Sequence, residues 1–169
     1  MMLAAVRAVH FAAVLLLFGG FIFVVFVARP AFPDAGSDVR DDELALHRWL
    51  LRIAAASLVV ALASGALWLG LEAAEMSALS LREAWQRNVV GAVLNETRFG
   101  QLCKARFGIA AALGVLIVLD LRRAGSRGGT TSAIGLVLAG LLLATLALTG
   151  HAAAWSDPPA EAGEAAEAV

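Results

Sequence analysis

Charged residues are scarce in this sequence and absent from three long stretches of it. Asp, Glu, Lys and Arg make up 16% of its 169 residues, whereas soluble proteins contain about 25%. The uncharged stretches are residues 8–28, 53–71 and 128–156. Each could form a membrane-spanning helix, which needs about 20 mostly apolar residues. A soluble bundle of such helices is excluded, because too few polar side chains remain to cover it.

Several other features are missing. The one cysteine, Cys103, leaves no internal disulfide to form. The chain has no GxSxG, HExxH, CxxC or P-loop sequence, and no GxGxxG that opens a helix after a strand. No basic stripe suited to nucleic acid accompanies its net charge of −1. We therefore expect neither an enzyme of a familiar soluble class nor a nucleic-acid partner.

These patterns predict an all-α membrane protein in which residues 1–155 form a bundle of four transmembrane helices. The spans are expected at about residues 3–28, 49–71, 99–121 and 132–154. The third is the weakest, since its uncharged core between Arg106 and Asp120 is short. Long basic side chains near helix ends reach lipid headgroups, so Arg7 and Arg106 are expected to extend toward the membrane surface.

The connections differ in character. A short charged loop is expected up to about His47, which we interpret as a solvated loop residue. The longest connection, about residues 72–100, should hold a short interfacial helix, because Ser80 and Glu83 form a capping-box pattern. Its apolar stripe is Leu81, Trp85, Val89 and Val93. A plain surface helix is the alternative. Residues 156–169, rich in Ala, Glu and Pro, are expected to be a disordered acidic tail.

The short basic loop between spans three and four favours one orientation. Its residues are Arg122, Arg123 and Arg127. Under the positive-inside rule this loop is cytoplasmic, which places both termini in the periplasm. Tryptophans near the span ends are expected in interfacial belts. They are Trp49, Trp68, Trp85 and Trp155.

Two of the three histidines should share one side of the membrane. His10 lies near the start of the first span and His151 at the end of the fourth. With four crossings, these two positions face the same compartment whichever way the protein is inserted. An ionisable residue inside a span indicates function by default, and imidazole binds copper, iron and zinc. The alternative for each is a neutral histidine that only makes a structural hydrogen bond.

Two histidines do not complete a metal site. Soft ligands expected on the same side are Met76 and Cys103, and thioether and thiolate groups favour Cu(I). Cys103 could instead be a small apolar residue of a helix. We predict a metal site formed by His10, His151, Met76 and Cys103.

Three short strings, taken in order, resemble the CopD copper-resistance family. The first is Arg7-Ala8-Val9-His10-Phe11 with Phe18-Gly19-Gly20, the second is Thr97-Arg98-Phe99-Gly100-Gln101, and the third is Thr149-Gly150-His151-Ala152. The resemblance covers nearly the whole chain and implies a bacterial inner-membrane protein of copper transport, resistance or homeostasis. It implies that Cu⁺ or Cu²⁺ is bound near the periplasmic face, beside a periplasmic copper-binding partner.

The chain also departs from that family. Family members continue into a second set of spans with further histidines, so this sequence resembles the N-terminal half alone. Either the chain is a compact relative, or it is truncated, or it pairs with a second copy or another membrane subunit that completes the site. The competing interpretation is a four-helix haem-binding oxidoreductase subunit, similar to the small membrane protoporphyrinogen oxidases, with haem between His10 and His151. The third interpretation is a structural membrane subunit that binds no ligand.

Overall fold

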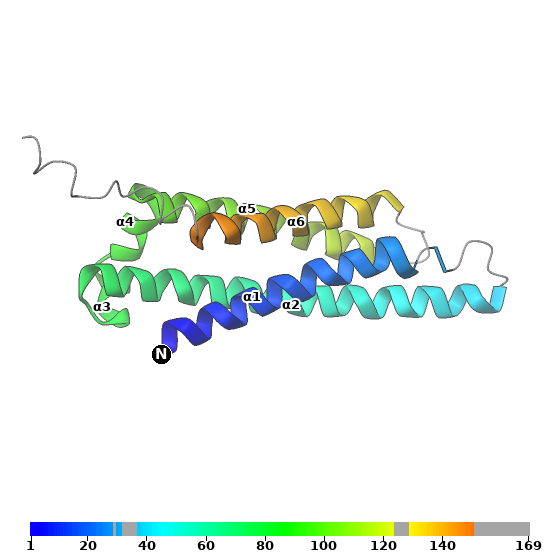
Figure 1. Ribbon diagram of the computed structural model, residues 1–169, viewed down its shortest axis with the longest axis horizontal. Coiled ribbons are helices and arrows are strands. Elements are labelled where there is room, and N and C mark those ends of the chain that lie inside the picture. Colours follow the sequence, from blue (N-terminus) through cyan, green and yellow to red (C-terminus); the bar gives the residue numbers. More distant parts are fainter. Residues whose placement is uncertain (29, 32–36, 124–128, 151–169) are drawn as a thin grey trace, which may run out of the picture.

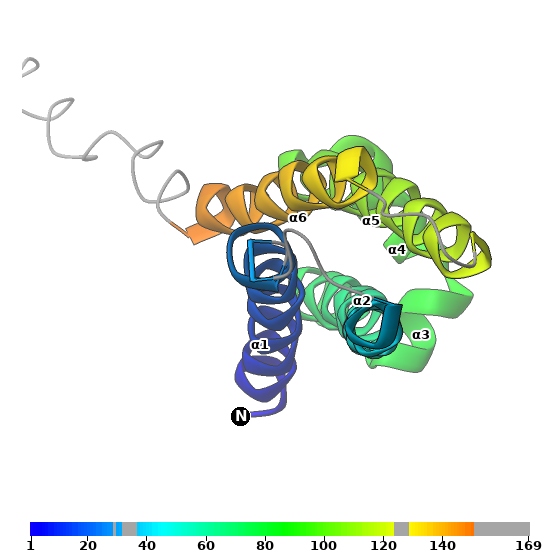
Figure 2. The same cartoon turned by 90° about the vertical axis from the view of Figure 1, so that its right-hand side faces the viewer.

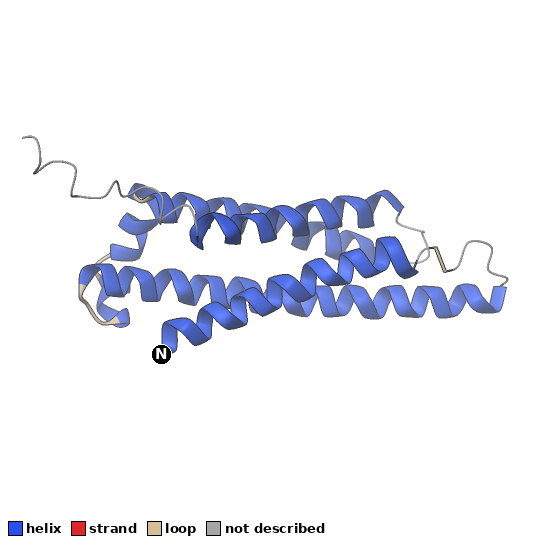
Figure 3. Cartoon of the chain, in the orientation of Figure 1, coloured by secondary structure: helices blue, strands red, loops and turns tan. Residues whose placement is uncertain are grey.

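In the part of the chain that the computed structural model describes, all regular secondary structure is helical (Figure 3). The structure describes residues 1–28, 30–31, 37–123 and 129–150, with the backbone alone at 37–41, 129–130 and 149–150. The elements are α1 (Met2–Phe23), the π-helical turn η1 (Val24–Ala28), α2 (Ser37–Ser77), α3 (Leu81–Gln86), α4 (Val89–Glu96), α5 (Arg98–Arg122) and α6 (Gly129–Gly150). His151, Trp155, Arg127 and the predicted tail, 156–169, lie outside the described residues.

Four helices are long and apolar enough to cross a membrane, which confirms the predicted all-helical fold with four candidate spans. They cover Met2–Ala28, Asp42–Ser77, Arg98–Arg122 and Thr131–Leu148. Helix α1 packs on α2 and α6, and α5 packs on the same two helices, so the four close into a ring (Figure 2). The start of α1 and the ends of α2 and α6 lie at one end of this bundle (Figure 1).

Apolar side chains fill the centre of the ring and also cover its outside. Val14, Leu17 and Leu113 are fully buried at the centre. The ring of Phe21 packs directly against Gly135 on α6. A Cβ at position 135 would overlap this ring. Large apolar side chains remain exposed on every long helix, among them Leu16, Val59, Val115 and Val137. An apolar outer surface on all four helices is suited to lipid, not to water.

Helix α2 begins earlier than the sequence suggested. The charged segment before Trp49 was expected to be a loop as far as His47, but the helix starts at Ser37. That expectation was wrong because loss of hydrophobicity does not by itself end a helix. Between Ser37 and Trp49 there is no glycine or proline, and Leu, Ala, Arg and Glu are good helix formers.

The connection between the second and third spans is helical, as predicted, but divided. The capping box of α3 is present, with Ser80 and Glu83 bonded to each other's backbone N–H. Asn88 adopts a left-handed conformation (φ 56°) that separates α3 from α4. Thr97 caps α5 by accepting a hydrogen bond from the Gly100 N–H at 2.9 Å. Both short helices lie at the end of the bundle where α1 begins (Figure 1).

Candidate functional site

His10 lies inside the bundle and is held by the backbone of α2. Only 4% of the residue is exposed. Its Nδ1 lies 2.9 Å from the Ala61 carbonyl oxygen and 3.1 Å from Ser64 Oγ. The Ser64 hydroxyl donates to the Val60 carbonyl at 2.6 Å, so Ser64 Oγ is an acceptor toward the ring. Two acceptors at Nδ1 require the proton there.

This tautomer leaves the other ring nitrogen as a lone-pair donor. Nε2 of His10 is buried and has no hydrogen-bond partner. A buried polar atom without a partner is rare and calls for an explanation. Histidines that bind metals donate the remaining N–H to a carbonyl or carboxylate in just this way, which fixes the tautomer and the ring orientation.

The His10 ring forms part of the wall of a small cavity between the four long helices. Its volume is about 20 Å³, a little more than the roughly 10–15 Å³ that one water molecule needs. The polar or sulfur-bearing residues in the wall are His10, Cys103 and Arg106. The remainder is apolar and consists of Ala61, Leu62, Gly65, Phe107, Ala110 and Leu142. The cavity has room for one ion or one water molecule.

Cys103 brings a soft ligand to the same cavity. It lies on α5 as a free, buried thiol. It also packs in an apolar cluster with Val90, Val93 and Ala73 beneath α4. His10 and Cys103 therefore meet at one cavity, although 93 positions separate them in the sequence (103 − 10).

Arg106 turns into the bundle instead of reaching the membrane surface, so its expected position was wrong. Only 5% of the residue is exposed. Its Nε donates to Thr145 Oγ1 at 3.0 Å and its Nη2 to the Thr145 carbonyl at 2.7 Å. The guanidinium carbon lies 5.2 Å from the centre of the Trp68 ring. Hydrogen bonds across α5 and α6 and a cation–π contact compensate its burial.

A second polar group lies beside the cavity. Arg7 Nη2 pairs with Glu72 Oε2 at 2.8 Å, and Trp68 Nε1 donates to the same oxygen at 3.1 Å. The Arg7 guanidinium carbon lies 5.1 Å from the centre of the Trp68 ring. Trp68 was expected in an interfacial belt, but it is buried with its ring centre 5.7 Å from that of His10. Because the Glu72 carboxylate accepts a hydrogen bond from the indole N–H, burial leaves no polar atom of Trp68 without a partner.

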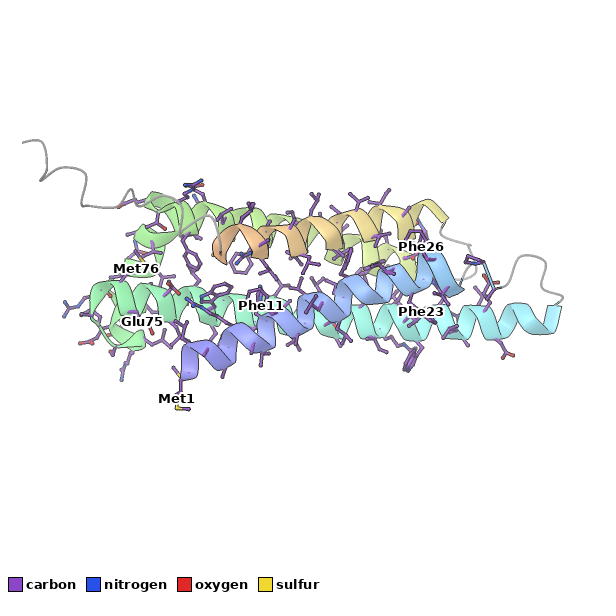
Figure 4. The ribbon with its side chains drawn as sticks, in the orientation of Figure 1. Met1, Phe11, Phe23, Phe26, Glu75 and Met76 are labelled. Carbon is purple, nitrogen blue, oxygen red and sulfur yellow. The ribbon has the colours of Figure 1, made fainter. Side chains whose placement is uncertain are left out.

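Of the other two predicted ligands, the structure describes only Met76, which does not line this cavity. Met76 lies near the end of α2 (Figure 4), where 61% of it is exposed. His151 lies outside the described residues. Within the described residues, no three His, Cys, Asp or Glu side chains cluster closely enough to hold a metal ion. Sequence reasoning missed Ser64 and Thr145, because hydroxyl residues carry no signal without their tertiary partners.

The third histidine belongs to a separate polar contact. His47 was interpreted as a solvated loop residue, but it lies on α2 with its Nε2 3.2 Å from Asp120 Oδ2. The two side chains are 24% and 4% exposed. This correction follows from the early start of α2, because the additional helical turns carry His47 alongside α5. His47 lies near the start of α2 and Asp120 near the end of α5. Helix α2 begins at the far end of the bundle from the start of α1 (Figure 1).

Comparison with known proteins gives the family. No curated protein and no solved structure matched the chain significantly. The family model described as "Copper resistance protein D-like, N-terminal domain" matches residues 1–157. It covers all four spans, including His10, Cys103 and Arg106. The chain therefore belongs to the copper resistance protein D-like family and corresponds to its N-terminal domain.

Proposed function

We propose that this membrane domain binds copper within its helical bundle, at His10 and Cys103, and passes it across the membrane or to a partner. Copper is the cargo of this process, and we propose no enzymatic activity. The observation that carries the proposal is the buried, unpartnered Nε2 of His10, in a ring that shares a cavity with the Cys103 thiol.

The chemistry of the two side chains suits copper. An imidazole with its proton fixed on Nδ1 offers the Nε2 lone pair, and a cysteine offers a soft thiolate sulfur. Binding an ion to Cys103 displaces the thiol proton, so copper affinity should rise with pH. Burial of His10 and Cys103 keeps bulk water away from both ligands.

His151 and Met76 complete the proposed ligand set. His151 belongs to the segment that follows α6, and α6 ends at the same end of the bundle as the start of α1 (Figure 1). The exposed thioether of Met76 lies at that end too, where it suits a transient ligand for incoming copper (Figure 4). We propose His10 and Cys103 as the inner ligands, and Met76 and His151 as the outer ones.

We place this domain in a bacterial inner membrane, with both termini and the copper entrance toward the periplasm. The basic residues Arg122 and Arg123, at the opposite end of the bundle, support this orientation under the positive-inside rule. A periplasmic copper-binding protein would then supply the metal. A second copy, or another membrane subunit, would supply further ligands to the ion.

The cavity favours copper over the haem alternative. Its volume of about 20 Å³ is far below the roughly 300–1,000 Å³ of pockets that hold organic ligands. A porphyrin between α1 and α6 would have to displace Leu17, Leu142 and their neighbours from the core. The purified protein should therefore show no Soret absorption.

Copper affinity of the full chain tests the proposal. The purified protein in detergent is titrated with Cu(I) against a chromophoric chelator, beside His10→Ala and Cys103→Ala. Each substitution should weaken binding at least about 100-fold, a loss of roughly 2.7 kcal/mol or more. His47→Gln is the matched control, because it removes a histidine outside the cavity and keeps an N–H donor near Asp120. Equal affinities in all four proteins would remove the proposed site.

A further inference from the structure

One side of α2 remains exposed along most of the helix and carries two arginines near one end. The exposed residues recur every three or four positions, as they do on one side of a helix. They are Ala45, Arg48, Trp49, Arg52, Ala56, Val59, Val60, Ala63, Ala66 and Leu67. Leu51, Leu58 and Ala61 are buried on the other side. The exposed side is apolar after Arg52, so it is the side of α2 that meets lipid.

Trp49 and Arg52 lie where this side of α2 enters the membrane. Trp49 is 58% exposed, and exposed tryptophans of membrane proteins are typical of the level of the lipid headgroups. The uncharged run of residues 53–71 begins directly after Arg52. Arg52 follows Trp49 by three positions, about 4.5 Å further along the helix axis. The backbone of Arg52 therefore lies at the edge of the hydrocarbon.

Arg48 and Arg52 form no ion pair with any residue that the structure describes. No Asp or Glu lies three or four positions from either arginine in the sequence, so no carboxylate of α2 is one turn away. The two arginines are themselves four positions apart, and like charges at that spacing destabilise a helix. An anion that reaches both guanidinium groups removes this cost.

The direction of α2 turns both arginines toward the headgroups. Cα–Cβ bonds in an α-helix tilt toward its N-terminus, and α2 starts at Ser37, well before its apolar part. This tilt directs Arg52 toward Arg48 and the membrane surface. Long basic side chains at the ends of spans reach headgroups in the same way.

We propose that Arg48 and Arg52 bind the phosphate of an anionic phospholipid. A guanidinium donates two parallel hydrogen bonds to phosphate oxygens. A lipid with net negative charge suits two arginines better than a zwitterionic one, whose own cation repels them. Its acyl chains would continue along Ala56, Val59 and Val60. This site lies at the far end of the bundle from the start of α1 (Figure 1), so the inference does not depend on copper.

Native mass spectrometry of the full chain in a non-ionic detergent tests this proposal. Phosphatidylglycerol and phosphatidylcholine with identical acyl chains are titrated separately, and the affinity of the first bound lipid is measured. Each arginine near an anionic lipid surface contributes about fivefold in affinity, so the wild-type protein should bind phosphatidylglycerol about 25-fold more tightly than phosphatidylcholine. Arg48→Gln/Arg52→Gln should bring the two affinities to within about threefold of each other.

Arg122→Gln is the matched control. Asp120 faces α2 through its contact with His47, and two further positions turn Arg122 by about 200°, to the other side of α5. Arg122 is exposed at the same end of the bundle. The substitution therefore removes an equal charge without changing the exposed side of α2, and it should change the ratio of the two affinities by less than about twofold.

The possible results are distinct. A wild-type protein without a preference for phosphatidylglycerol, or a double variant that keeps it, contradicts the proposal. An equal loss in Arg122→Gln shows attraction by diffuse charge, not a site on α2. Millimolar inorganic phosphate should leave the lipid bound, and complete displacement by phosphate shows that the arginines bind a free anion instead. All variants replace exposed side chains, and circular dichroism establishes that they are folded.

Discussion

His10 keeps its position because the residue facing it on α2 has no side chain. A Cβ on Gly65 would lie 3.1 Å from His10 Cε1, which is closer than such atoms normally approach, and 3.5 Å from Nδ1, which is an ordinary contact. Gly65→Ala should therefore turn or shift the imidazole and weaken copper binding roughly tenfold, as when the surroundings of a metal ligand are altered.

Gly108→Ala is the matched control for that substitution. Gly108 lies on α5, and a Cβ there would meet no atom within 4 Å. Its copper affinity should equal that of the wild-type protein in the chelator titration. If Gly65→Ala also binds normally, the position of His10 does not set the affinity.

At the scale of single residues, the sequence predicted which residues belong to the site better than it predicted which side chains surround them. His10 could be identified because an ionisable residue in an apolar run is costly and therefore significant. The inward turn of Arg106 and the burial of Trp68 could not, because both depend on the rotation of α2 and α5 about their axes. Their partners, Thr145 and Glu72, become neighbours only when the helices pack.

Among the elements, α2 and α5 are linked by a polar contact away from the cavity. Asp120 is almost fully buried, and His47 is its hydrogen-bond partner. His47→Ala should lower the free energy of unfolding by about 3 kcal/mol, because it leaves a buried carboxylate without this partner. The double variant His47→Ala/Asp120→Asn should recover at least half of that loss. Unfolding in mixed micelles measures both, and equal stability of all three proteins would show that this contact is unimportant.

The stability of helix α3 depends on the exposed carboxylate of Glu83 and therefore on pH. The Ser80 hydroxyl donates to Glu83 Oε2 at 2.7 Å and the Ser80 N–H at 3.1 Å, and both bonds hold the pKa of Glu83 below its usual value of 4.5. A lowered folded-state pKa stabilises the helix above the unfolded pKa, and this stabilisation is lost as pH falls through the folded pKa.

Amide exchange at the start of α3 should therefore quicken, after correction for the intrinsic pH dependence, as pH falls below about 4.5. Glu83→Gln should remove this additional dependence, because the amide does not titrate in that range. Exchange in α5, capped by Thr97 without a carboxylate, is the internal reference. A wild-type profile that matches that of Glu83→Gln would contradict this role of the capping box.

The elements themselves were largely predictable. Uncharged runs indicated the four spans, and the Ser80 and Glu83 spacing indicated the start of α3. The start of α2 was missed because it depends on helix propensity beyond the apolar run. At about 1.5 Å per residue, its 41 residues extend roughly 60 Å, about twice the hydrocarbon thickness of a bilayer.

For the whole molecule, four spans place the two chain ends on one side of the membrane. The proposed orientation puts them in the periplasm, opposite Arg122 and Arg123. Alkaline phosphatase fused after Val169 should be active in cells, and a green fluorescent protein at the same position should remain dark. The reverse pattern would place the copper entrance in the cytoplasm.

The most direct test of a copper site at His10 and Cys103 is copper K-edge X-ray absorption of the copper-loaded full chain. One sulfur and at least one imidazole nitrogen should contribute to the first coordination shell. The sulfur contribution should vanish in Cys103→Ser, and the imidazole contribution should decrease in His10→Ala. A shell of oxygen and nitrogen alone, unchanged by either substitution, would contradict the proposed site.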